Sequence, residues 1–155
     1  MTILLDMDGV LVTVPSWRKV EIGTDGFMLF NEKAAKNLAD ILSKTNASIV
    51  LTTTHRINYN IERWLEILAA RGLKLQCIAK VNSVNSIPLM GSRASEIERW
   101  VNDNNEENYV IIDDDLSIES LPESIKSRWV KTNPMIGIDE EAKQAVLQIL
   151  GVVNQ

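Results

Sequence analysis

The feature of this sequence that most constrains its fold is a regular alternation of short apolar segments with stretches that carry a helical repeat. The apolar segments have the length of buried strands and are bounded by polar residues. They comprise residues 2–5, 47–53, 75–81, 109–112 and 129–132. Strands that alternate with helices predict an α/β fold of the Rossmann type, a three-layer sandwich around a mainly parallel sheet.

Four segments carry apolar residues three or four positions apart, the spacing of one helix face. The first helix is expected to span residues 32–44 behind an N-cap at Asn31, and the last to follow an N-cap at Asp139. Gly72 and Gly151 follow the second and the last segment, where helices commonly end. The apolar positions are Ala34, Leu38, Ile41 and Leu42; Ile61, Trp64, Leu65 and Leu68; Ile97, Trp100 and Val101; and Ala142, Val146, Ile149 and Leu150.

The connecting segments are too short for a second domain. Residues 20–22 and 27–29 flank Gly-Thr-Asp-Gly, which predicts a β-hairpin, and residues 81–92 have the composition of a loop. About two dozen residues separate Asp8 from the first helix. The residues between the second and fourth apolar segments are mostly taken up by two helices and a strand. We expect residues 1–155 to form a single domain with a hairpin flap and no inserted cap.

Composition narrows the class of protein. No apolar run approaches the ~20 residues needed to cross a bilayer, and no basic segment precedes an apolar one as in a secretory signal. Cys77 is the only cysteine, which excludes an internal disulfide and suits a reducing cytoplasm. The formal net charge of −5 argues against a broad cationic surface for duplex nucleic acid. We expect a cytoplasmic protein that does not bind membranes.

Polar residues of a particular kind follow three of the predicted strands. Asp6 and Asp8 come after the first, Thr-Thr-Thr-His-Arg (52–56) after the second, and three aspartates (113–115) after the fourth. If these strands are parallel neighbours, their ends meet at one edge of the sheet and crowd several carboxylates, which repel each other. A bound divalent cation relieves that repulsion, and oxygen ligands favour Mg²⁺.

Simpler interpretations exist for each segment alone. Asp-x-Asp-Gly is common in turns, and the aspartates at 113–115 could cap a helix. An EF-hand loop does not fit, because it needs glycine at its sixth position, whereas Gly9 is the fourth residue counted from Asp6. The order and spacing of the three segments favour one shared site.

Together these segments resemble the haloacid dehalogenase (HAD) superfamily. ILLDMDGVL is similar to its first motif, hhhhDxDGxL with h an apolar residue; IVLTT resembles the second motif and YVIIDDD the fourth. WVKTNPMIGIDEEAKQAVLQIL is similar to the closing strand and helix of small HAD domains, so the resemblance covers nearly the whole chain. A further likeness is to the small HAD domains of bacterial RNA-repair proteins. The resemblance implies a capless phosphatase with Mg²⁺ as its cofactor.

The resemblance also implies roles for individual residues. Asp6 matches the nucleophile that attacks phosphorus, and Asp8 matches the general acid that protonates the leaving oxygen and later activates water. A two-residue offset places both side chains on one side of the chain and Met7 on the other. Asp113 and Asp114 match the acidic pair that holds Mg²⁺, together with Asp6 and the backbone carbonyl of Asp8. Which of the pair contacts the ion directly stays open.

Two motifs leave alternatives. Thr53 is chosen for the second motif, where a hydroxyl and a backbone N–H meet the phosphoryl oxygens; Thr52 and Thr54 are the adjacent alternatives. The third motif requires a cation before the fourth, and the sequence offers Arg93 and Lys80. We prefer Arg93, because a delocalised guanidinium suits bidentate phosphate binding.

Four further residues near these motifs are candidates for the site. Gly9 allows a sharp turn beside a bound substrate, and Arg56 either contacts substrate or is solvated. His55 is the only histidine, either a hydrogen-bonded loop residue or a catalytic one. Trp17 either stacks on a nucleic-acid base beside its basic neighbours or packs beneath the hairpin.

The leading functional hypothesis is a Mg²⁺-dependent phosphomonoesterase that works through an aspartyl-phosphate. The capless layout and the RNA-repair likeness favour polynucleotide 3′-phosphate ends as its substrate. A nucleotidase or a small-metabolite phosphatase is the alternative among enzymes. A non-catalytic phosphate-binding or regulatory module is the alternative of another class, but such a module is expected to lack Asp6 or Asp8, and both are present.

Overall fold

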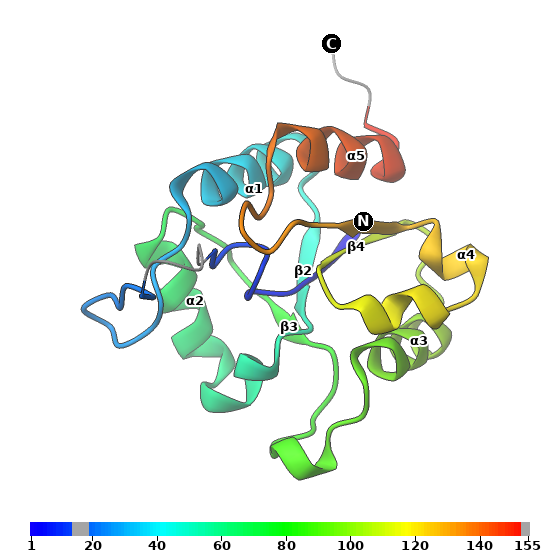
Figure 1. Cartoon of the computed structure of the whole chain (residues 1–155), viewed down its shortest axis with the longest axis horizontal. Helices are drawn as coiled ribbons and strands as arrows, with labels where there is room; N and C mark the ends of the chain where they lie inside the picture. The colour runs from blue at the N-terminus through cyan, green and yellow to red at the C-terminus, as the bar shows by residue number, and fades with distance from the viewer. Residues whose placement is uncertain (14–18, 153–155) are drawn as a thin grey trace.

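The computed structural model describes residues 1–13 and 19–152, and within them it contains a five-stranded sheet between two layers of helices (Figure 1). The strands are β1 (Thr2–Leu5), β2 (Ser48–Leu51), β3 (Ala79–Lys80), β4 (Tyr109–Asp113) and β5 (Trp129–Lys131). Their order is β3-β2-β1-β4-β5, and every neighbouring pair is parallel. Because β1 lies between β2 and β4, the carboxyl ends of these three strands meet at one edge, as predicted.

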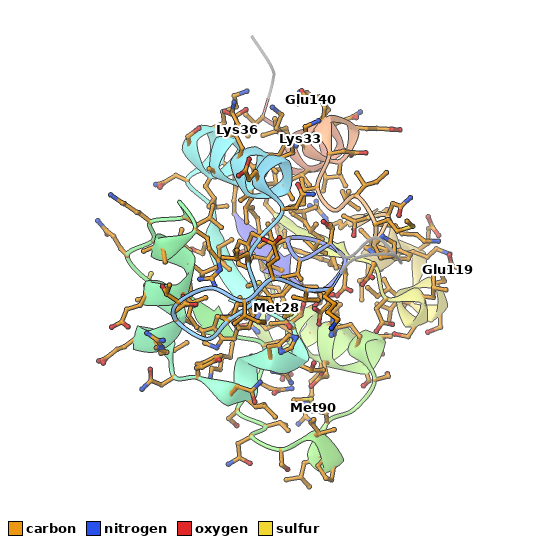
Figure 2. All side chains as sticks on the ribbon, turned by 60° about the vertical axis from the view of Figure 1, so that its left-hand side comes forward. Met28, Lys33, Lys36, Met90, Glu119 and Glu140 are labelled. Atoms are coloured by element: carbon orange, nitrogen blue, oxygen red, sulfur yellow. The ribbon has the colours of Figure 1, made fainter. Side chains whose placement is uncertain are left out.

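The helices form a layer on each face of the sheet. They are α1 (Glu32–Thr45), α2 (Ile61–Ala70), α3 (Arg93–Asn104), α4 (Glu123–Lys126) and α5 (Glu140–Leu150). Because strand side chains alternate, Ile3 and Leu5 of β1 pack in the core beneath α1, α2 and α5, whereas Leu4 packs beneath α3 and α4. Charged side chains such as Lys33, Lys36 and Glu140 lie on the outer side of α1 and α5 (Figure 2). Among the described residues, no helix is long and apolar enough to span a membrane.

The long helices and their caps agree with the sequence-based predictions. Asn31 accepts a hydrogen bond from the backbone N–H of Ala34 through its side chain, at 3.0 Å. Asp139 does the same for Ala142, at 2.8 Å. Gly151 ends α5 in the left-handed conformation, with φ of 78°.

Short elements differ from the predictions. The strand expected over residues 75–81 is reduced to β3, because it lies at the edge of the sheet and pairs only with Val50 and Leu51 of β2. The expected loop over residues 81–92 contains the 3₁₀ helix η2 (Ile87–Leu89). Sequence analysis also missed α4 and two further 3₁₀ helices, since elements this short contain no complete amphipathic repeat. These are η1 (Thr54–Asn58) and η3 (Leu116–Ser120).

The predicted hairpin, here called the flap (residues 20–29), is present and is fixed to α2. Ile22 and Met28 form its antiparallel bridge. Arg71, directly after α2, donates to both carboxylate oxygens of Asp25 at 2.6 and 2.9 Å. The same guanidinium donates to the backbone carbonyls of Phe27 and Met28 at 3.0 and 2.9 Å. This bidentate, charge-assisted contact holds the flap beside the carboxyl edge of the sheet.

Candidate active site

Asp6 is the first residue beyond the central strand and lies in the interior. Its backbone N–H donates to the carbonyl of Ile112 at 3.2 Å, which continues the pairing of β1 with β4. Its side chain is buried. Met7 packs in the core, and its carbonyl accepts from the backbone N–H of Leu11 at 2.9 Å. This tight turn brings Asp8 back toward the surface.

The carboxylates of β1 and β4 converge as the sequence predicted. One oxygen from each of Asp6, Asp113 and Asp114 lies within 4.8 Å of the other two. Burial, followed by the charge of Asp113, raises the pKa of Asp6 well above its usual value, and the same two causes raise the pKa of Asp114. Crowded, all-oxygen donors that are costly to ionise together fit a hard divalent cation such as Mg²⁺.

Arg93, the first residue of α3, is the cation at this cluster. Its guanidinium nitrogen Nη1 lies 2.7 Å from Asp113 Oδ2 and 3.2 Å from Asp6 Oδ1. Burial by itself would lower the pKa of Arg93, but Asp6 and Asp113 raise it above its usual value, so the side chain stays charged. The alternative, Lys80, points elsewhere and donates to the backbone carbonyl of Tyr59 at 2.7 Å. The geometry therefore favours Arg93 over Lys80.

The threonines after β2 lie in three different environments. Thr53 caps η1: its Oγ1 accepts from the backbone N–H of His55 at 3.2 Å, and the residue is buried. Thr52 is also buried, and its Oγ1 has no hydrogen-bond partner in the described part of the chain. Thr54 is exposed. The three threonines thus differ in burial and contacts, and Thr53 is the N-cap of η1, which begins just beyond β2.

Asp8 and His55 form a contact that sequence analysis did not foresee. His55 Nε2 lies 2.8 Å from Asp8 Oδ2, across 47 positions of the chain. The hydrogen bond to Asp8 raises the pKa of His55, so the imidazolium form is favoured at higher pH than usual. The sequence signal was that the only histidine stands two residues after Thr53, where the strand ends.

A family model matches the sequence over most of the chain. Residues 2–142 match the model of a family described as the HAD domain in Swiss Army Knife RNA repair proteins. The chain belongs to this HAD family. No curated protein matches the sequence. The family match confirms the predicted HAD resemblance, and the parallel sheet with its helices confirms the α/β fold; no separate cap domain is evident among residues 1–13 and 19–152. HAD membership indicates a hydrolase of the phosphatase kind, and HAD domains generally use a divalent metal.

The position of Arg56 in this HAD domain corrects its interpretation as a solvated or substrate-contacting residue. The side chain is 0% exposed, and its Nη2 lies 2.5 Å from Glu96 Oε2. It also donates to Asn82 at 3.0 Å and to the carbonyls of Thr52 and Thr53, both at 3.1 Å. Arg56 therefore ties the end of β2 to α3 from inside.

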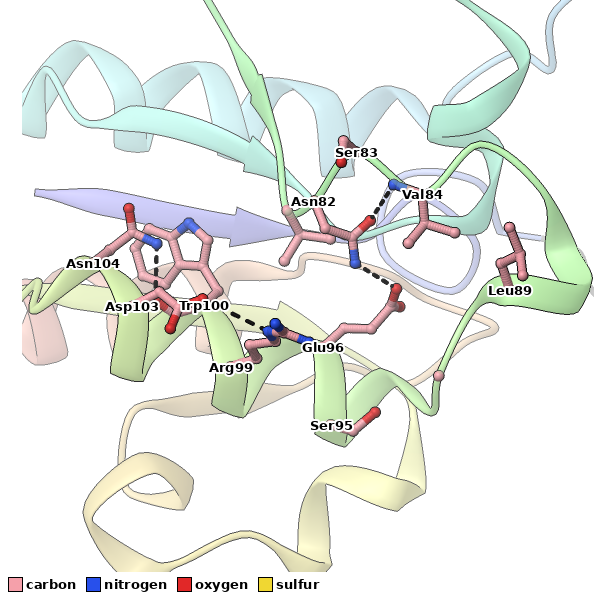
Figure 3. A pocket seen from close by; sticks show the side chains of 12 residues that line it. Asn82, Ser83, Val84, Leu89, Ser95, Glu96, Arg99, Trp100, Asp103 and Asn104 are labelled. Atoms are coloured by element: carbon pink, nitrogen blue, oxygen red, sulfur yellow. Dashed lines mark hydrogen bonds and ion pairs between the residues drawn. The ribbon is translucent and has the colours of Figure 1, made fainter.

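Glu96 and Asn82, the partners of Arg56, line a cavity of about 530 Å³ between α3 and the loop after β3 (Figure 3). Asn82 donates to Glu96 at 2.9 Å and accepts from the backbone N–H of Val84. Neither catalytic candidate, Asp6 nor Asp8, lines this cavity. Trp17, the proposed base-stacking residue, lies outside the described residues.

Gly9 is required next to the acidic cluster of the HAD domain for two reasons. Its φ is +78°, a region that residues with a side chain rarely adopt. A Cβ atom at this position would lie 2.1 Å from Asp114 Oδ2. The carbonyl of Gly9 accepts from Thr132 Oγ1 at 2.7 Å, which fixes the turn from the β5 side.

We expect Gly9→Ala to weaken binding of a divalent cation at the acidic cluster about 10- to 100-fold, because the added methyl group must displace the Asp114 carboxylate. The measurement is a Mg²⁺ titration followed by thermal stabilisation of the protein. Gly72→Ala is the matched control: Gly72 has a φ of +86°, but a Cβ there meets nothing within 4 Å. Equal Mg²⁺ affinities for the two variants would contradict the expected role of Gly9.

Proposed function

We propose that this HAD domain is a Mg²⁺-dependent phosphomonoesterase that works through an aspartyl-phosphate on Asp6. The observation that carries the proposal is the meeting of Asp6 with Asp113, Asp114 and Arg93 at one edge of the sheet. A buried carboxylate beside a fixed cation is arranged to attack an anionic phosphoryl group rather than to stabilise the fold.

Asp6, Asp113 and Asp114 are the residues that would hold Mg²⁺, with the backbone carbonyl of Asp8 as a further oxygen donor. When bound, the ion offsets negative charge on the carboxylates and on the phosphoryl oxygens. Asp113 is already engaged, since Oδ2 accepts from Arg93 and Oδ1 accepts from the backbone N–H of Asp115 at 3.0 Å. This supports Asp114 as the direct ligand of the pair and Asp113 as a ligand through water.

The chemistry proceeds in two displacements at phosphorus. A carboxylate oxygen of Asp6 attacks phosphorus, the bond from phosphorus to the ester oxygen breaks, and Asp8 gives its proton to that oxygen. Water then attacks the aspartyl-phosphate, Asp8 takes a proton from the water, and inorganic phosphate leaves Asp6 with its carboxylate restored. Arg93 and the turn at Thr53 supply positive charge and donors for the equatorial phosphoryl oxygens.

The 3′-phosphate end of a polynucleotide is the proposed substrate. The described segments that could carry an inserted cap form the flap, the short 3₁₀ helices η1 and η2, and the elements α2, β3 and α3. A site without a cap admits a terminal phosphate that is followed by a long chain. The family description, which names RNA repair proteins, supports the same class of substrate. A nucleotidase or small-metabolite phosphatase is the alternative, since the same edge also admits a mononucleotide.

The test compares three substrates with purified protein in Mg²⁺: an aryl phosphate, a 3′-phosphorylated oligoribonucleotide and a nucleoside monophosphate. We expect all hydrolysis to stop in EDTA and to return with excess Mg²⁺, because three carboxylates cannot position a phosphoryl group while they repel it. We expect the oligonucleotide to have the highest kcat/KM. If only the mononucleotide is hydrolysed, the proposed polynucleotide substrate is wrong. If no phosphoester is hydrolysed, a non-catalytic binding module is favoured.

A further inference from the structure

The side chain proposed as the general acid is poorly restrained by its own surroundings. The Asp8 side chain is 57% exposed. In the described part of the chain, its one side-chain hydrogen bond is the 2.8 Å contact between Asp8 Oδ2 and His55 Nε2. An exposed carboxylate samples several rotamers unless a partner holds it, and misplacing an acid by about 1 Å lowers the rate of proton transfer.

His55, in contrast, is held from two sides. Its backbone N–H donates to Thr53 Oγ1 at 3.2 Å, at the end of β2. Its ring meets the ring of Phe27 edge-to-face, with centroids 5.6 Å apart and planes at 90°. Because the next residue, Arg56, is buried and bonded to the carbonyls of Thr52 and Thr53, the backbone of this turn is fixed from inside.

Phe27 is itself anchored and gives His55 a firm support. It packs edge-to-face against Trp64 of α2 at 5.2 Å and against Tyr59 at 6.0 Å. The Arg71 guanidinium lies 5.5 Å from its ring centroid. The imidazole of His55 therefore lies between the flap, which is fixed to α2, and Asp8. One side of its ring packs against Phe27, and its Nε2 contacts Asp8 Oδ2.

We propose that His55 is the positioning residue for Asp8, an inference that rests on the proposed phosphatase function. The Nε2–H of His55 donates to Oδ2 and fixes the carboxyl group, which leaves Oδ1 to pass its proton to the ester oxygen as the bond to phosphorus breaks. In the second displacement, Oδ1 takes a proton from the attacking water. His55 acts through Asp8 and does not contact the phosphoryl group.

This role makes a specific prediction about the leaving group. A good leaving group such as p-nitrophenolate departs without a proton, whereas a ribose alkoxide needs one. The ratio kcat/KM reports the steps up to departure of the leaving group, so it isolates this first proton transfer. Loss of the His55 hydrogen bond should lower kcat/KM for alkyl esters and spare kcat/KM for aryl esters.

The experiment measures kcat/KM of His55→Phe and His55→Gln on p-nitrophenyl phosphate and on a nucleoside 3′-monophosphate. His55→Phe keeps an aromatic contact with Phe27 but has no donor; we expect a loss of about 10- to 100-fold on the nucleotide and less than about threefold on the aryl ester. His55→Gln retains an N–H near the same place and should recover most of the loss. In an Asp8→Ala background, His55→Phe should have no further effect.

The outcomes separate this inference from the function on which it rests. If the wild-type protein hydrolyses neither ester, the phosphatase function fails, and the role of His55 fails with it. If the wild-type protein hydrolyses both esters but His55→Phe lowers both values equally, His55 only supports the flap and the inference is wrong. The inference is also wrong if His55→Phe leaves both values unchanged, or if its effect persists without Asp8.

Discussion

Asp6→Asn is expected to lower phosphatase activity by about 10³-fold or more while it makes the metal-free protein more stable. The amide keeps the shape of the side chain but is not a nucleophile, so the proposed aspartyl-phosphate could not form. Stability should rise because burial and the charge of Asp113 oppose ionisation of Asp6, and these two effects outweigh the attraction of Arg93. In the proposed function, the wild-type protein thus carries an unfavourable charge that would serve catalysis.

The pH dependence of this stability difference gives a further check. The pKa of Asp6 is higher in the folded than in the unfolded protein, so its ionised form destabilises the fold. The advantage of Asp6→Asn should be absent below the unfolded pKa, near 4. It should grow as the pH rises toward the folded pKa. Melting curves in EDTA measure the difference, and a variant less stable than the wild type at neutral pH would contradict the expectation.

Arg56→Met should lower the free energy of unfolding by about 3–5 kcal/mol, because it leaves the buried Glu96 carboxylate without its cation. The carbonyls of Thr52 and Thr53 also lose a donor in the interior. Urea unfolding, followed by circular dichroism, measures the change. Because the turn that carries His55 begins at these carbonyls, activity should fall as well.

Two variants control for this interpretation of Arg56. Arg99 forms an exposed pair with Asp103 at 3.7 Å on α3, and Arg99→Met should change stability by less than about 1 kcal/mol. The double variant Arg56→Met/Glu96→Leu removes both charges and should recover part of the loss. A loss below about 1 kcal/mol for Arg56→Met alone would show that the buried pair does not stabilise the fold.

The sequence was sufficient to predict the acidic cluster, because the aspartates stand at the ends of strands that are neighbours in a parallel sheet. In a parallel sheet the ends of adjacent strands meet, so Asp6 and Asp113 could be brought together without knowledge of any side-chain contact. The choice between Arg93 and Lys80 was harder. Both stand near the ends of elements, and only the direction in which α3 starts brings Arg93 to Asp6.

The incorrect interpretation of Arg56 has a physical cause. A charged residue within a polar stretch is expected to be solvated, because burying a charge without a partner has a high free-energy cost. Its partner Glu96 lies 40 positions away on α3, and nothing local to residues 52–56 reveals it. The contact between Asp8 and His55 was hidden in the same way, since it joins the turn after β1 to η1, and these segments lie side by side only once the sheet has formed.

Because β1 is the central strand of the sheet, the candidate active site can form only after both of its neighbouring strands have been synthesised. Thr2 pairs with Tyr109, which a ribosome adding ~5–20 residues per second reaches on the order of 5 to 20 seconds later. Until then one side of the strand has no neighbour, and Asp6 has neither of its acidic companions from β4. Fragments that stop short of β4 contain Asp6 but not the acidic cluster, so the proposed hydrolytic activity requires β4 to have been synthesised.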